Sequence, residues 1–312
     1  MKRGILLLNM GGPNNIDEVE LFLRNMFADP RILPMAPWLR RMIGKRIVRK
    51  RLHEARENYR QLGGKSPLTE ITWSLAEKIE RMSGVPVRPA MRYVPPFAAA
   101  ALKEFRAEGI DELVLFPMYP QYSSTTTLSS LDDISAQCDA LDYHPRIRIV
   151  DPYYDDYDYL SIQAELIAEA MAGARSEAYD LILSAHGLPM SIIRAGDPYE
   201  KQVEANVSAL KIVLRERGIR FRKIRLAYQS KVGNAAWLEP NLADLLRRPE
   251  NMKVLVFPLA FTVDNSETIF ELDREHREIA EKIGYDDYRV ARCPNDRDAF
   301  ARFIGEKIAA PD

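Results

Sequence analysis

Short apolar segments recur along the chain, and each ends in polar residues, glycine or proline. Five of them stand out, at residues 4–8, 112–116, 146–150, 181–184 and 253–257. Because their apolar character is mostly continuous, the pattern predicts strands buried on both faces, as in a parallel sheet covered by helices. Helical patterns separate the strands, for example at 199–218 and 265–284, and both end at a glycine suited to a C-cap. The predicted fold class is therefore α/β, doubly wound.

Two of the predicted strands run into similar sequences. Residues 114–118 (Val-Leu-Phe-Pro-Met) resemble residues 255–259 (Leu-Val-Phe-Pro-Leu), and a polar stretch follows each. This repetition indicates two similar βα halves with a cleft between them, although buried strands can also look alike without a repeat. We place an N-terminal α/β domain at 1–155 and a C-terminal α/β domain at 156–295. A last helix within 296–312 could pack on either half and complete the first.

Composition narrows the class of protein. The 312 residues are 46% hydrophobic and 29% charged, which is typical of a globular chain long enough for two domains. Lys and Arg number 44 against 45 Asp and Glu, so no nucleic-acid partner is expected. Two distant cysteines, Cys138 and Cys293, exclude a disulfide scaffold, a zinc finger and a four-cysteine iron–sulfur cluster within one chain. Apolar runs are too short for a signal peptide or a membrane span, which favours a cytoplasmic location.

The first candidate for chemistry is His186, one of four histidines, which follows the strand predicted at 181–184. In an open parallel sheet, ligands bind beyond the carboxyl ends of the strands, so we expect the imidazole to face that crevice. Gly187 follows it and lets the backbone turn sharply. The alternative is a purely structural histidine at a strand end, and the residues alone leave both interpretations open.

Three glutamates share one face of the helix predicted at 265–284. Glu267, Glu271 and Glu275 stand at positions i, i+4 and i+8. Like charges at this spacing oppose each other by roughly 0.2–0.5 kcal/mol per exposed pair, and a divalent cation near them would relieve that repulsion. With His186 at the mouth of the same sheet, one imidazole and a carboxylate become candidate ligands for Fe, Zn, Co or Ni.

A second interpretation of the same segment requires no ligand. Asp264 and Glu267 have the spacing of the N-cap and N3 residues of a capping box. Arg274 and Arg277 could then neutralise the remaining carboxylates on a solvated face. On this interpretation the glutamates would only cap the start of the helix and keep its exposed face soluble.

An apolar segment, Ile32–Leu39, comes directly before a basic stretch. It contains Trp38, and seven of the next twelve residues, 40–51, are Lys or Arg. An apolar lip beside a cationic face suits a membrane surface, or a flat apolar ligand that carries carboxylates. An ordinary amphipathic surface helix explains the pattern equally well.

Eight short motifs are spread over nearly the whole chain. They lie at residues 8–13 (LNMGGP), 62–68 (LGGKSPL), 91–96 (MRYVPP), 119–127 (YPQYSSTTT), 184–189 (SAHGLP), 196–199 (GDPY), 228–233 (YQSKVG) and 264–268 (DNSET). In sequence and order they resemble the ferrochelatase family, the lyases that insert ferrous iron into a porphyrin at the end of haem synthesis. The resemblance implies two Rossmann-like domains, each a parallel sheet flanked by helices as in class II chelatases, with the porphyrin held in the cleft.

By that resemblance, His186 and Glu267 form the catalytic pair at the metal site. Glu271 and Glu275 match an acidic stripe along which the metal arrives. The porphyrin contacts that the resemblance implies are Met10, Arg51, Tyr59, Ser66, Arg92, Tyr119, Tyr122 and Trp237. Gram-positive relatives that act on coproporphyrin often carry tyrosine at the position of Met10, so methionine implies protoporphyrin IX.

The resemblance also implies the partners. Porphyrin and ferrous iron are substrates, and no resident cofactor is required. Animal members of the family add a C-terminal iron–sulfur segment whose cysteines this sequence lacks, so no cluster is expected. We expect a cytoplasmic monomer, with contact at the inner face of the membrane through Ile32–Leu39 as a further expectation. The alternatives are a coproporphyrin III ferrochelatase, a cobalt or nickel tetrapyrrole chelatase, and a non-catalytic porphyrin or haem carrier.

Overall fold

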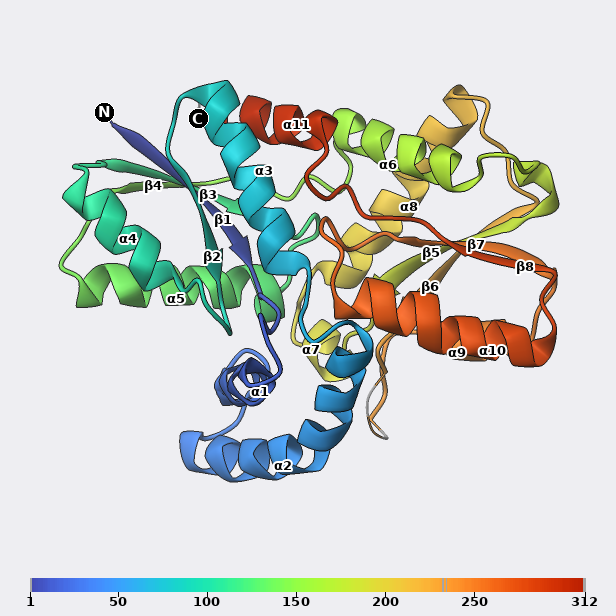
Figure 1. Ribbon diagram of the computed structural model, residues 1–312, viewed down its shortest axis with the longest axis horizontal. Coiled ribbons are helices and arrows are strands. Elements are labelled where there is room, and N and C mark those ends of the chain that lie inside the picture. The colour runs from blue at the N-terminus through green and yellow to red at the C-terminus, as the bar shows by residue number, and fades with distance from the viewer. Residues whose placement is uncertain (1, 232, 234, 311–312) are drawn as a thin grey trace. The chain divides into compact units, whose positions relative to one another are not determined.

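The computed structural model describes residues 2–231, 233 and 235–310, which divide into two compact units (Figure 1). Unit 1 consists of Met1–Tyr119, Ser123–Asp151 and Asp296–Asp312, and unit 2 of Pro120–Tyr122 and Pro152–Asn295. Each unit contains a four-stranded parallel sheet flanked by helices. The predicted fold class, two Rossmann-like α/β domains, is therefore confirmed.

The sheet of unit 1 has the strand order β2-β1-β3-β4. Its strands are β1 (Arg3–Asn9), β2 (Val87–Met91), β3 (Glu112–Pro117) and β4 (Arg146–Ile149). Its helices are α1 (Glu18–Ala28), α2 (Pro37–Gln61), α3 (Leu68–Ser83), α4 (Ala98–Ala107), the π-helix η1 (Ser124–Leu128), α5 (Ser129–Ala140) and α11 (Asp298–Ala309). The central strands β1 and β3 are almost entirely buried, as their continuous apolar sequences predict.

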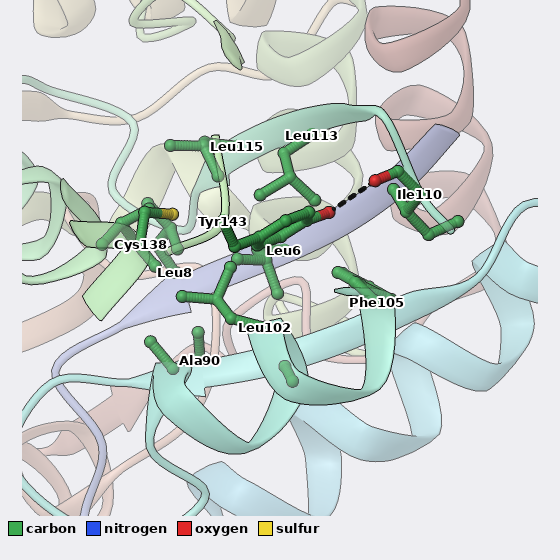
Figure 2. Close-up of a cluster of buried hydrophobic side chains, with 13 residues drawn as sticks. Leu6, Leu8, Ala90, Leu102, Phe105, Ile110, Leu113, Leu115, Cys138 and Tyr143 are labelled. Carbon is green, nitrogen blue, oxygen red and sulfur yellow. Dashed lines mark hydrogen bonds between the residues drawn. The ribbon is translucent and has the colours of Figure 1, made fainter. Parts of the chain in front are cut away.

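A hydrophobic cluster lies between this sheet and two helices (Figure 2). Leu6 of β1 and Leu113 of β3 meet Phe105 of α4 and Cys138 of α5 there. Tyr143 joins the cluster and satisfies its hydroxyl by donating a hydrogen bond to the carbonyl of Ile110 (2.8 Å). The buried phenol therefore adds apolar area without leaving a polar atom unpaired.

The sheet of unit 2 has the order β6-β5-β7-β8, which repeats the arrangement of unit 1 strand for strand. Its strands are β5 (Asp180–His186), β6 (Lys223–Gln229), β7 (Lys253–Pro258) and β8 (Asp287–Val290). Its helical elements are α6 (Tyr157–Ala170), the 3₁₀ turn η2 (Ser176–Ala178), α7 (Met190–Arg194), α8 (Tyr199–Glu216), α9 (Leu242–Leu246), the π-helix η3 (Glu267–Glu275) and α10 (His276–Ile283). The shared strand order agrees with the sequence repetition between the two halves.

The differences from the predicted strands all concern sheet edges. β2, β6 and β8 were not predicted, and each is an edge strand. They contain charged residues, and β2 also contains Pro89, both of which an edge strand tolerates because one side meets solvent. The prediction that 146–150 is buried on both faces is wrong, since β4 is an edge strand with Ile147 and Ile149 exposed.

Candidate functional site

The carboxyl edge of the unit 2 sheet brings a histidine and a polar turn together. His186 is the last residue of β5 rather than two residues beyond it, and it pairs in register with Gln229, the last residue of β6. Gly187 is required after it, because a Cβ there would lie 2.8 Å from the carbonyl oxygen of Gln229. The imidazole therefore stands at the edge where ligands bind in this fold class.

The helix predicted at 265–284 has two parts. Its first part, η3, is a π-helix with i→i+5 hydrogen bonds, and its second part, α10, is an α-helix that ends at Gly284 with a left-handed φ of 93°. The C-cap at Gly284 was predicted, whereas the π-helical start was not. π-helical turns are rare and occur frequently at functional sites.

The interpretation of this segment as a capped, solvated helix is wrong. The side-chain oxygen of Asn265, not of Asp264, accepts the N–H of Glu267 (2.8 Å). The carboxylate of Asp264 is buried and accepts a hydrogen bond from the hydroxyl of Thr268 (3.0 Å). Arg277 pairs with an aspartate of η3 rather than with a glutamate. The Glu267 side chain is therefore available to the edge of the sheet.

His186 and Glu267 meet, as predicted, although 81 positions separate them. Nδ1 of His186 lies 2.7 Å from Oε2 of Glu267. Burial lowers the pKa of His186, but the charge of Glu267 and its hydrogen bond raise it more, so the pKa lies above its ordinary value. Burial raises the pKa of Glu267, but the charge and hydrogen bond of His186 lower it below its ordinary value. When Nδ1–H donates to Glu267, the neutral imidazole leaves Nε2 for a ligand or a proton.

The other two glutamates of the stripe lie in different surroundings. The carboxylate of Glu271 is beside Glu267, and burial together with repulsion by Glu267 raises its pKa to about 7. Glu275, at the end of η3, is exposed. In the part of the chain that the structure describes, no three His, Cys, Asp or Glu side chains are arranged to hold a metal ion. The four predicted metal residues therefore do not form a preorganised metal-coordination site.

Two residues of this cluster were missing from the predicted site. Ser230 contacts both Glu267 and Glu271 through its hydroxyl oxygen, at 3.2 Å and 2.5 Å. The side chain of Gln229 is buried, and its oxygen accepts a hydrogen bond from the hydroxyl of Ser184 (2.7 Å). Both belong to the motif at 228–233, which was the only sequence signal that could have pointed to them.

Two of the predicted porphyrin contacts lie in unit 2. Trp237 is half-buried, and its ring lies 3.5 Å from the position of a Cβ on Gly187, next to His186. The backbone N–H of Tyr122 donates to the side-chain oxygen of Gln202 (2.6 Å), which ties this segment to α8. The structure thus brings Trp237 next to His186, whereas the backbone of Tyr122 is bonded to α8.

In unit 1, two predicted contacts lie near the start of α5. The guanidinium of Arg92 donates to the carbonyl and hydroxyl of Ser129 (3.2 and 3.0 Å). The phenol oxygen of Tyr119 lies 3.4 Å from the hydroxyl of Ser130. A cavity of about 290 Å³ opens beside Arg92. Met10 is half-exposed and follows the carboxyl end of β1, so it also stands at a ligand-binding edge.

Of the other three predicted contacts of unit 1, Tyr59 and Ser66 are buried and Arg51 is partly exposed. Tyr59 is buried in the cluster between α1 and α2, and the guanidinium of Arg51 lies over the ring of Phe27 in the same helix pair (6.0 Å). Ser66 is buried, and its N–H donates to the carbonyl of Pro13 (2.8 Å). These residues shape the segments that follow β1 and α2.

Comparison with known proteins gives one consistent result. A family model described as Ferrochelatase matches residues 2–310. The chain is 49% identical to the ferrochelatase of Wolinella succinogenes over 99% of this chain and 98% of that protein. It is 47% identical to the ferrochelatase of Nitratiruptor sp. over 96% of each.

Two solved structures share the fold at low sequence identity. SirB from Bacillus subtilis with Fe³⁺ has a TM-score of 0.59 at 11% identity, covering 99% of this chain and 96% of its own. CbiX, described as the terminal enzyme of sirohaem biosynthesis in denitrifying bacteria, has a TM-score of 0.56 at 15% identity over all of both chains. These two similarities concern the fold alone.

Proposed function

Because the chain belongs to the ferrochelatase family, we propose that it inserts Fe²⁺ into protoporphyrin IX at the His186–Glu267 pair. The observation that carries this proposal is the 2.7 Å contact between the two side chains at the carboxyl edge of the unit 2 sheet. The family, predicted from the motifs, is confirmed by the family match and the named relatives. Met10 supports protoporphyrin IX over coproporphyrin III as the substrate.

Insertion exchanges two pyrrole protons for one Fe²⁺ ion, so the site must accept protons. Glu267 binds Nδ1 of His186 and leaves Nε2 as the nitrogen that accepts a pyrrole proton. Because the carboxylate stabilises the imidazolium, the imidazole is a stronger base than an isolated histidine. Glu271, with a pKa of about 7, can then take up or release a proton near neutral pH.

Iron must also lose water before it enters the macrocycle. Carboxylate oxygens are suitable ligands for a divalent cation while its waters leave. Glu267 and Glu271 offer neighbouring oxygens, and Ser230 contacts both. We therefore assign the arrival of iron to these carboxylates, with iron as a substrate rather than a resident cofactor.

An anaerobic assay of Fe²⁺ with protoporphyrin IX, followed by absorbance, tests the function. We expect catalytic formation of haem. Stoichiometric porphyrin binding without metallation would make the protein a carrier. Faster turnover with coproporphyrin III would identify that porphyrin as the substrate, and preference for Co²⁺ or Ni²⁺ with sirohydrochlorin would identify a different chelatase.

We expect Glu271→Gln to raise the apparent KM for Fe²⁺ by roughly tenfold, with a smaller change in the KM for porphyrin. The substitution keeps the size of the side chain but removes the charge that lies beside Glu267. Initial rates against each substrate in turn measure the two constants. Glu278→Gln, on the exposed face of α10, is the control and should behave like the wild type. An unchanged dependence on iron would remove Glu271 from the route.

A membrane contact through Ile32–Leu39 and the start of α2 is the second part of the proposal. Trp38 and Met42 are 68% and 58% exposed. The same helix also carries the exposed cations Arg41, Lys45, Arg46, Arg49 and Lys50. Within the described residues, no helix has the length and hydropathy of a membrane span. Exposed apolar side chains among cations suit a helix that lies at the surface of an anionic bilayer.

We expect Trp38→Ser to weaken binding to vesicles containing phosphatidylserine by about tenfold, because the indole would lose its place among the headgroups. Cosedimentation with vesicles measures the affinity. Trp73→Ser, a partly exposed tryptophan on α3, is the control and should leave binding unchanged. If neither vesicle binding nor porphyrin affinity responds to Trp38→Ser, α2 is an ordinary amphipathic helix.

A further inference from the structure

Ser230 has a backbone conformation that serine seldom adopts. Its φ is 65°, in the left-handed region, and it directly follows the end of β6. The Cβ of an L-residue makes this region unfavourable by about 1–2 kcal/mol. Strain of this kind persists where surrounding contacts determine the conformation, and it is concentrated at functional sites.

The left-handed turn directs both the N–H and the hydroxyl of Ser230 at the carboxylates of η3. The N–H donates to Oε1 of Glu271 (2.7 Å). The hydroxyl oxygen lies 2.5 Å from Oε2 of Glu271 and 3.2 Å from Oε2 of Glu267. One residue therefore contacts three carboxylate oxygens that belong to two side chains.

The strand end that carries Ser230 is itself fixed. Gln229 is buried, and its side chain accepts a hydrogen bond from Ser184 of the neighbouring strand β5. Gln229 also pairs in register with His186. Ser230 directly follows this paired position. Its contacts therefore hold Glu267 and Glu271 close to the strand ends that carry His186.

We propose that Ser230 is a positioning residue that sets the places of Glu267 and Glu271 relative to His186 for the arriving metal ion. A hydroxyl carries one hydrogen, so it donates to one carboxylate at a time. When a cation engages an oxygen of Glu267, the hydroxyl still has Glu271 as a partner. This role rests on the proposed function of the site.

Ser230→Gly tests the contacts of the side chain separately from the contact of the backbone N–H. Glycine adopts a φ of 65° without strain and keeps the N–H that bonds Glu271, so the variant loses the hydroxymethyl side chain but not the backbone contact. We expect the apparent KM for Fe²⁺ to rise about tenfold, the usual scale for residues that orient metal ligands, while the KM for porphyrin changes less than twofold. Ser230→Ala should show the same separation of the two constants and, because its Cβ keeps the strain that glycine relieves, a lower Tm than Ser230→Gly.

Asp142→Gly is the matched control. Asp142 also has a positive φ, 47°, but its side chain is exposed in unit 1, so the iron KM should not change. Wild-type protein that forms no haem would contradict the proposed function itself. With an active wild type, an iron KM within twofold of normal in Ser230→Gly would overturn the positioning role alone. An equal rise of both KM values would also overturn it, because it would indicate a general structural effect.

Discussion

His186→Ala should lower the rate of iron insertion by a factor of about 10²–10⁴, the usual contribution of a positioned acid–base group. The imidazole is the base that the geometry offers to the pyrrole protons, and its Nδ1 is already committed to Glu267. Porphyrin affinity should stay within twofold of the wild type, because the histidine acts on protons and metal. Haem formation under anaerobic conditions and porphyrin fluorescence measure the two quantities.

His144→Ala is the control for that experiment. His144 lies in unit 1 with its side chain 66% exposed, and its Nε2 lies 3.4 Å from the carboxylate of the exposed Asp142. Its loss should leave both the rate and the affinity unchanged. Near-normal turnover in His186→Ala would show that another group accepts the protons.

Asp29→Ala should destabilise the protein by about 3 kcal/mol, because it removes the buried acceptor of a polar cluster. The Asp29 side chain is 1% exposed. Its Oδ2 accepts hydrogen bonds from the hydroxyls of Tyr93 (2.8 Å) and Ser129 and lies 3.3 Å from the guanidinium of Arg92. Without the carboxylate, the phenol of Tyr93 is left with the longer contact to the hydroxyl of Ser129 (3.4 Å), and part of the Arg92 charge loses its partner.

Thermal unfolding measures this loss, and we expect the Tm to fall by roughly 6–12 °C. Asp132→Ala is the control, since it removes only the solvent-exposed ion pair with Arg31 and should cost less than about 1 kcal/mol. A Tm within about 2 °C of the wild type for Asp29→Ala would show that the cluster contributes little to stability.

The parts of the fold that could be predicted are those in which burial dictates composition. β1, β3, β5 and β7 occupy the interior of their sheets, so each contains a continuous run of apolar side chains that is visible in the sequence. β6 reads Lys-Ile-Arg-Leu-Ala-Tyr-Gln and resembles an ordinary polar segment, because an edge strand meets solvent. Pairing with β5, which no local pattern encodes, makes it a strand.

The site shows the same division. His186 could be placed at a strand end from the sequence, and the family motifs associated it with Glu267. The conformation of Ser230 and the π-helical winding of η3 could not be predicted, because both are set by contacts between distant segments. A spacing of four residues fits an α-helix as well as the start of η3, so periodicity alone could not distinguish the two.

The discontinuity of unit 1 affects the order in which the protein can fold during synthesis. α11 packs against α3 (Figure 1). The carbonyl of Ile308, near the end of α11, accepts hydrogen bonds from Arg3 and Arg148. All of unit 2 leaves the ribosome before α11 does, because residues 152–295 precede Asp298. The histidine–glutamate pair can therefore form on the nascent chain before α11, the last helix of unit 1, has been synthesised.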